Sequence, residues 1–169
     1  MAVGAFIFLI IFTSIYIEVI TGRMGLIIPL TAVSIFYLSI TFGWKRGLWL
    51  SIIAGTVIDM LYGRSIIVTP YLMLFTVAAS MFWLHKGDPV SILPNLIPGA
   101  TAAFLVSFPL LAVNAYQTKT YLENLYTLII SVVAGAVLLP LMIALFDYLA
   151  YKQGLPLYRK AKAAAMDRR

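Results

Sequence analysis

Residues 47–84 read GLWLSIIAGTVIDMLYGRSIIVTPYLMLFTVAASMFWL, and this stretch decides the fold class. Two apolar runs, Gly47–Tyr62 and Ser65–Leu84, meet at the dipeptide formed by Gly63 and Arg64. If the two runs formed one continuous helix, Arg64 would lie in the middle of a bilayer, which is energetically expensive. The stretch therefore predicts two membrane-spanning helices joined by a tight turn at Gly63.

The remaining sequence has the same apolar character. Of the 169 residues, 63% are hydrophobic and 11% are charged, whereas soluble domains are nearer half apolar and a quarter charged. We expect four further spans, at Ala2–Ile20, Met24–Phe42, Ile92–Tyr116 and Leu125–Ala150. No strand pattern of period two appears in the sequence, and open sheet edges are not viable in lipid. The sequence thus predicts an all-α polytopic membrane protein, with a bundle of about six transmembrane helices over residues 1–151 and a basic cytoplasmic tail over residues 152–169.

The basic residues indicate an orientation for this bundle. If the N-terminus is cytoplasmic, nine of the 12 Lys and Arg residues lie on the cytoplasmic side. The other three are Arg23, Arg64 and Lys119. The positive-inside rule then places both termini in the cytoplasm. This distribution also explains the net charge of +6 without nucleic-acid binding. The basic tail is a topology determinant in one interpretation and adheres to anionic inner-leaflet lipids in the other.

Small residues recur every four positions along the third expected span. The series is Gly47, Ser51, Gly55, Asp59 and Gly63, which places its members on one gently drifting stripe of a helix. Small side chains at this spacing allow a second helix to approach closely, where dispersion and weak polar contacts hold the two helices together. We interpret the stripe as a helix-packing or partner interface.

Asp59 is the charged member of this stripe. A lone carboxylate facing lipid is costly, so we expect Asp59 to face protein, with Arg64, Arg23 or a hydroxyl such as that of Thr56 beside it. In one interpretation Asp59 is a paired or protonated packing residue, and in the other it is a proton or substrate site. The absence of a matching intramembrane base favours the packing role.

The sequence contains little that could support catalysis. It has no cysteine and one histidine, His85, at an expected helix end, so a thiolate nucleophile is excluded and a zinc site is not expected. Asp59 lies about 18 Å and Asp147 about 5 Å from the inner ends of their expected spans, at a rise of about 1.5 Å per residue. Paired catalytic acids must nearly touch. We therefore expect no enzyme activity and no catalytic, cofactor or metal site.

Residues 47–84 resemble a segment of the rod shape-determining protein MreD family. In that segment a glycine-bearing helix carries an aspartate, and a glycine turn and a second helix follow. The matching positions are Gly55, Asp59 and Gly63. The end of the last span, with Pro140 and a short basic tail, is also similar in character to an MreD C-terminus. The match departs at Ile66 and Ile67, where MreD proteins often have a further glycine.

This resemblance implies a function and a location. The expected function is that of a non-enzymatic scaffold or assembly subunit of a bacterial cell-wall elongation complex in the cytoplasmic (inner) membrane. The implied partner is an MreC-like membrane protein, and through it the MreB–RodA–transpeptidase machinery of peptidoglycan synthesis.

A second family remains open. The substrate-binding subunits of energy-coupling-factor type vitamin transporters are also small six-helix bundles. They usually carry alanines four apart in the first helix, whereas Phe6–Phe12 here is mostly Phe, Ile and Leu. They also need polar groups that converge on an outward pocket, and beyond Glu18, Asp59 and Asn114 few are present. The scaffold interpretation is therefore preferred.

Overall fold

The computed structural model describes residues 2–86 and 93–167. Over these residues the chain is all-helical and contains no strand, as the sequence predicts. The helices are α1 (Ala2–Arg23), α2 (Leu30–Phe42), α3 (Trp44–Leu61), α4 (Thr69–Leu84), α5 (Leu96–Thr118), α6 (Tyr121–Lys152) and α7 (Tyr158–Met166), with a short 3-10 turn, η1 (Leu93–Asn95), before α5.

The lengths of these helices bear directly on the expectation of a membrane protein. Three of them, α1, α5 and α6, are long and apolar enough to cross a bilayer. Two others, α2 with 13 residues and α4 with 16, are apolar but shorter. The remaining long helix, α3, has 18 residues and carries the charges of Lys45, Arg46 and Asp59. The structure is thus that of a helical membrane protein with at least three candidate spans among the described residues.

The second expected span, Met24–Phe42, is helical only from Leu30. Gly25 has a positive φ of 83° and ends the turn that follows α1. Pro29 then precedes the first helical residue, and a proline disfavours the α conformation in the residue before it. The segment between Gly25 and Pro29 therefore runs as a linker, and the Ser131 hydroxyl on α6 donates a hydrogen bond to the Ile27 carbonyl within it.

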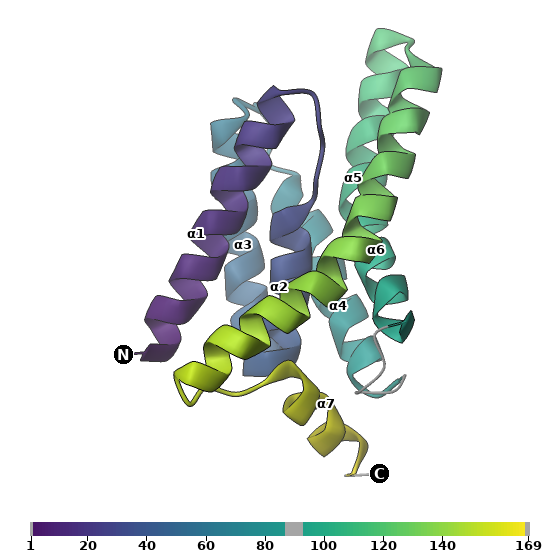
Figure 1. Cartoon of the computed structure of the whole chain (residues 1–169). Coiled ribbons are helices and arrows are strands. Elements are labelled where there is room, and N and C mark those ends of the chain that lie inside the picture. The colour runs from purple at the N-terminus through teal and green to yellow at the C-terminus, as the bar shows by residue number, and fades with distance from the viewer. Residues whose placement is uncertain (1, 87–92, 168–169) are drawn as a thin grey trace.

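Helix α2 lies at the centre of the bundle (Figure 1). Every residue from Leu30 to Thr41 is buried, which is the pattern expected for a helix that is apolar all round. It packs against α1, α3, α4, α5, α6 and α7. Because its neighbours cover all its sides, α2 provides the common core to which the other helices attach.

Helices α5 and α6 form a hairpin whose far end projects beyond the other helices (Figure 1). The two backbones cross at Gly99 and Gly135. A Cβ atom on Gly99 would overlap the Gly135 carbonyl oxygen, and one on Gly135 would overlap the Ala103 side chain. Near the projecting end, Asn114 donates a hydrogen bond of 2.9 Å to Asn124. Small residues at the crossing therefore allow close contact between these two long helices.

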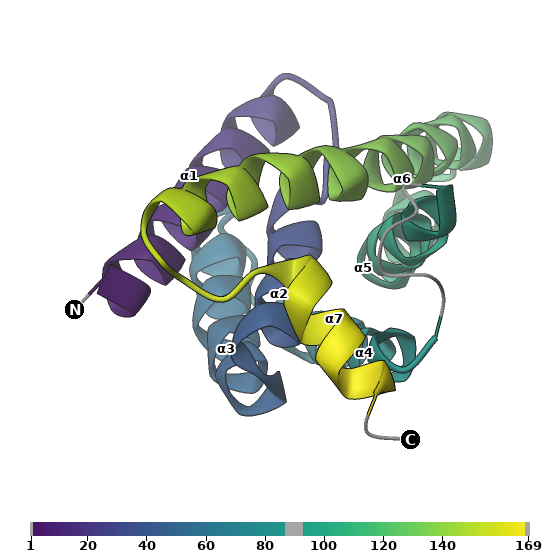
Figure 2. The ribbon, with the colours of Figure 1, turned by 60° about the horizontal axis from the view of Figure 1, so that its bottom comes forward.

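The expected basic tail is folded over much of its length. After a turn that contains Gly154, residues 158–166 form α7, which lies across the ends of α2 and α4 (Figure 2). Tyr158 is fully buried and stacks on Tyr37 of α2, with ring centroids 5.8 Å apart. The Lys162 ammonium lies 4.9 Å from the centroid of the Trp83 ring. Aromatic packing thus holds this segment against the helical core.

Candidate functional site

The joint between α3 and α4 contains Asp59, Gly63 and Arg64, three residues of the predicted small-residue stripe and turn. Helix α3 ends in a Schellman motif, in which Arg64 N–H donates to the Asp59 carbonyl at 2.9 Å and Gly63 N–H donates to the Met60 carbonyl at 3.0 Å. Gly63 has a φ of 64°, a left-handed conformation that glycine adopts without steric cost. The glycine therefore reverses the chain within one residue and points Arg64 back towards α3.

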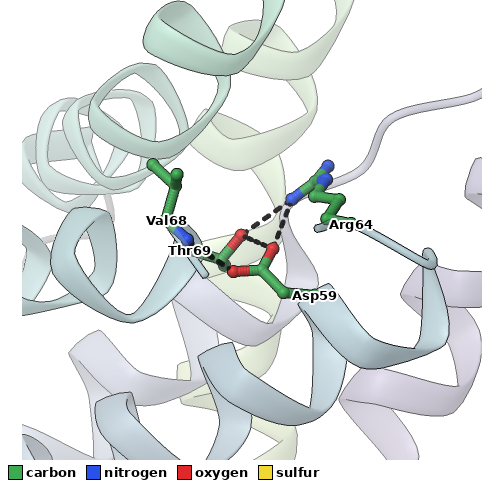
Figure 3. Close-up of polar contacts among 4 residues, drawn as sticks. All are labelled: Asp59, Arg64, Val68 and Thr69. Atoms are coloured by element: carbon green, nitrogen blue, oxygen red, sulfur yellow. Dashed lines mark hydrogen bonds and ion pairs between the residues drawn. The ribbon is translucent and has the colours of Figure 1, made fainter. Parts of the chain in front are cut away.

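The Asp59 carboxylate accepts four hydrogen bonds in this joint (Figure 3). One oxygen accepts from the backbone N–H groups of Val68 and Thr69, both at 2.8 Å. The other accepts from the Thr69 hydroxyl at 2.5 Å and from the Arg64 guanidinium at 2.7 Å. Since α4 begins at Thr69, the side chain of Asp59 caps the N-terminus of the following helix.

Burial explains why so many donors surround this one side chain. Asp59 is fully buried, whereas the side chain of Arg64 is 33% exposed. A buried carboxylate is tolerated when its charge is paired and its oxygens are hydrogen-bonded. Arg64 also donates to the Thr69 hydroxyl at 2.8 Å, which closes a triangle of polar contacts. Of the two basic residues proposed as charge partners, Arg64 forms the ion pair, and Arg23 is exposed at the end of α1.

The other members of the stripe pack against helices of the same chain. A Cβ atom on Gly47 would overlap the Ser39 side chain of α2, and one on Gly55 would lie 2.5 Å from the Pro70 nitrogen of α4. Ser51 is buried between them and donates to the Gly47 carbonyl at 2.8 Å. The stripe from Gly47 to Asp59 is therefore an internal packing face towards α2 and α4, and Gly63 lies exposed in the turn beyond it.

A second acid caps a helix in the same way at the joint between α1 and α2. Glu18 is buried on α1, and its carboxylate accepts a hydrogen bond of 2.7 Å from the backbone N–H of Thr31 in the first turn of α2. The Tyr62 hydroxyl at the end of α3 donates to the Glu18 carbonyl at 3.1 Å. Tyr62 also lies against Gly22, where a Cβ atom would overlap its hydroxyl. Two helix joints therefore meet at this end of the bundle.

A third acid caps α7. Asp147 on α6 accepts hydrogen bonds from the Tyr158 backbone N–H at 2.8 Å and from the Tyr37 hydroxyl at 2.9 Å. Tyr158 is the first residue of α7, and its hydroxyl donates to Asn95 at 3.2 Å. Burial and the nearby charge of Asp147 raise the pKa of Tyr158, so its phenol remains protonated and able to donate. One carboxylate thus ties α2, α6 and α7 together.

The role that Glu18 and Asp147 share with Asp59 as helix caps was not predicted from the sequence. In each case an acid on one helix caps the next helix or segment in the chain, and a proline stands near the start of the capped helix: Pro29, Pro70 or Pro156. This order of acid, turn, proline and helix is a signal in the sequence, although the N–H groups that each acid reaches depend on how the helices pack. The Gly99 and Gly135 crossing was likewise signalled by small residues four apart, Gly99 with Ala103 and Ser131 with Gly135.

The hydrogen bonds of the three capping acids serve to stabilise the fold. The three acids direct their oxygens at backbone N–H groups and hydroxyls of their own chain. Within residues 2–86 and 93–167, no group of three or more His, Cys, Asp or Glu side chains could hold a metal ion. His85 is exposed at the end of α4, where its Nδ1 lies 3.3 Å from the Met81 carbonyl oxygen.

Comparison of the chain with protein-family models, with curated proteins and with solved structures finds no match in any of the three.

Proposed function

We propose that this chain is a non-enzymatic scaffold or assembly subunit of a bacterial cell-wall elongation complex, similar in role to MreD proteins. The observation that carries the proposal is the structure of the α3–α4 joint. The residues that resemble the MreD segment, Gly55, Asp59 and Gly63, act there as a close contact, a helix cap and a turn. A motif used in this way suits a protein whose task is to hold a defined shape in the membrane.

The proposal includes six spans with both termini in the cytoplasm of a bacterial inner membrane. Helix α2 covers about 20 Å at 1.5 Å per residue, which is shorter than the hydrocarbon core of about 30 Å. The linker between α1 and α2 adds length, and its Ile27 carbonyl is hydrogen-bonded to Ser131 of α6. Non-helical backbone is tolerated at membrane depth where protein satisfies its polar groups. Helix and linker together would complete the second crossing.

The burial of the small-residue stripe restricts where a partner would bind. Residues from Gly47 to Asp59 already pack against α2 and α4, so an MreC-like partner would contact other helix faces. Aromatic residues at a spacing of four remain exposed on α1, where Phe8 and Phe12 stack with ring centroids 5.8 Å apart, and on α5, where Phe104 and Phe108 stack at 5.0 Å. These faces are available to a partner helix.

Affinity purification from native membranes tests the proposal. The chain is tagged at its C-terminus, extracted in a mild detergent and analysed for proteins that co-purify. We expect recovery of an MreC-like membrane protein, with or without wall-synthesis enzymes. Photo-crosslinkers placed at Phe12 and at Phe108 would then identify the partner face, with the buried Phe36 as the negative control.

The same experiment can contradict the proposal. Recovery of paired ATPases together with a coupling membrane subunit would identify the chain as the substrate-binding subunit of an energy-coupling-factor type transporter. Asp59 would then be tested as a ligand or gating residue, because loss of transport in Asp59→Asn with complex assembly intact would contradict a purely structural role.

A further inference from the structure

An apolar groove runs between α1 and the C-terminal half of α6. It has a volume of about 440 Å³. Figure 1 shows the C-terminal half of α6 crossing the bundle towards the N-terminal half of α1. The floor includes the buried residues Phe6, Ile10 and Ser14, and the walls include the exposed residues Leu9, Leu141 and Leu145.

Nearly all of the groove lining is apolar. The Ser14 hydroxyl in the floor is hydrogen-bonded to the Ser34 hydroxyl at 2.6 Å, so it presents no unsatisfied polar group to the groove. The walls are formed mainly by Leu, Ile and Phe side chains, with Thr13 and Gln153 as the other polar residues that line it. Such a surface accepts a hydrocarbon chain and offers little to a polar ligand.

The length of the groove matches one leaflet of a bilayer. Along α1 it extends from Phe6 to Ile17, which corresponds to about 17 Å at 1.5 Å per residue. Along α6, which crosses the bundle obliquely (Figure 1), the lining runs from Leu138 to Gln153, about 22 Å at the same rise. Half of a hydrocarbon core of about 30 Å is about 15 Å. A partner helix that spans the membrane would require roughly twice this length, whereas an acyl chain of one leaflet fits it.

Basic residues surround the end of the groove at which α6 terminates. Gln153 lines the groove, and the next residues in the chain, 154–157 of the α6–α7 turn, line a second hollow of about 440 Å³ together with Lys160. Lys152, Arg159 and Lys160 are exposed at this end. Asp147 is the nearby acid, and its carboxylate is occupied by Tyr37 and by the N-terminus of α7.

We propose that this groove binds one anionic phospholipid of the leaflet on the side of α7. An acyl chain lies between α1 and α6, and the phosphate headgroup lies at the α6–α7 turn beside Lys152 and Lys160. The Lys152 ammonium lies 4.7 Å from the centroid of the Tyr148 ring, a contact that leaves its positive charge in place, and Lys152 precedes Gln153 of the groove lining. Basic pockets between membrane helices on the cytoplasmic side recognise anionic headgroups in this way. This lipid site goes beyond the scaffold role and does not depend on the identity of any protein partner.

Native mass spectrometry of the purified chain tests the lipid site. The delipidated protein is equilibrated with mixed micelles that contain equal amounts of phosphatidylglycerol and phosphatidylcholine, which share the same acyl chains. We expect one phosphatidylglycerol to be retained in preference to phosphatidylcholine. Lys152→Gln and Lys160→Gln should each weaken that retention about fivefold, as expected for the loss of one basic charge near an anionic headgroup.

Matched variants separate the groove from general effects. Lys45→Gln removes a basic charge at the start of α3 that lines neither hollow, and it should leave retention unchanged. Leu145→Trp fills the groove and should abolish retention, whereas Val137→Trp places the same side chain on an exposed position of α6 outside it. If Leu145→Trp does not give a folded protein, Ile17→Trp fills the groove from α1.

Three results would overturn the proposal. Equal retention of the two lipids would exclude headgroup recognition. An effect of Lys45→Gln equal to that of Lys152→Gln would assign the preference to net charge. Undiminished binding by a folded groove-filling variant would place the lipid elsewhere.

Discussion

Asp59 joins two helices through its backbone and its side chain together. Its carbonyl accepts the bond that terminates α3, and its carboxylate accepts the two N–H groups that begin α4. A buried N–H group that finds no acceptor is costly, and in the proposed membrane setting no water could satisfy it. The burial of a charge at this joint is therefore explained by the needs of the two helix ends.

Replacement of Asp59 tests this explanation at the level of the residue. Asp59→Ala removes all four acceptor contacts and leaves Arg64 without its counter-charge. We expect the free energy of unfolding to fall by about 3 kcal/mol. This value is the lower end for a broken buried ion pair, because Arg64 is partly exposed. Asp59→Asn should recover little of this loss, because its amide nitrogen would face donors. The midpoint of thermal unfolding in detergent measures both variants.

The control for Asp59 is Glu123→Ala, which removes an exposed acid from the first turn of α6. Its effect should be limited to the helix-dipole contribution of about 0.3–1 kcal/mol. Equal unfolding midpoints for Asp59→Ala and the unmodified chain would show that the cap contributes nothing to stability.

Helices in this chain meet at two kinds of contact, acids that cap the next helix and small residues that allow close approach. The contact between Gly55 and Pro70 brings the middle of α3 against the first turn of α4, directly beneath the Asp59 cap. The contact between Gly99 and Gly135 does the same for α5 and α6. Both kinds of contact are needed at the α3–α4 joint, because the cap forms only if the helices lie close together.

A methyl group at Gly55 tests the close contact. In Gly55→Ala the new Cβ atom would lie 2.5 Å from the Pro70 nitrogen and 2.6 Å from its Cα. Neither backbone atom can move without shifting α4, so we expect a loss of about 1–3 kcal/mol in stability. Gly4→Ala is the matched control, since nothing lies within 4 Å of a Cβ atom there. A thermal midpoint of Gly55→Ala no lower than that of Gly4→Ala would contradict the packing role.

The Asp147 cap should determine how often α7 detaches from the rest of the chain. Asp147→Ala removes the acceptor for the Tyr158 N–H and the Tyr37 hydroxyl, so α7 should detach more often. A lost cap costs about 1 kcal/mol, which corresponds to roughly fivefold faster cleavage when opening is rapid and reversible. Limited proteolysis with trypsin, which cuts after the exposed Arg159 and Lys160, measures this rate. An unchanged rate would mean that aromatic packing alone holds α7.

In the molecule as a whole, the basic residues are distributed unevenly between the two ends of the helix bundle. Lys45, Lys86, Lys152 and Lys160 stand at or beyond the ends of α2, α4 and α6 on the side that carries α7 (Figure 2). Arg23, Arg64 and Lys119 stand at the opposite helix ends. Under the proposed six-span topology, the positive-inside rule predicts that the α7 side faces the cytoplasm.

Cysteine labelling tests this orientation, because the chain contains no cysteine of its own. Lys119→Cys, in the turn between α5 and α6, should react with a membrane-impermeant maleimide in cells whose inner membrane is intact. Ala164→Cys, exposed on α7, should react only after that membrane is permeabilised. Labelling of both sites in intact cells, or the reverse order, would contradict six spans with cytoplasmic termini.

The sequence by itself determined the all-helical membrane class and the turn at Gly63, because hydropathy, glycine content and the cost of a charge in lipid act locally along the chain. It also indicated that Asp59 requires donors and that Arg64 lies near enough to be one. Tertiary structure alone decided that the stripe from Gly47 to Asp59 packs inside the chain, that Glu18 and Asp147 cap helices, and that the basic tail folds back as α7. These contacts join residues distant in sequence, so their partners depend on how the helices pack around α2.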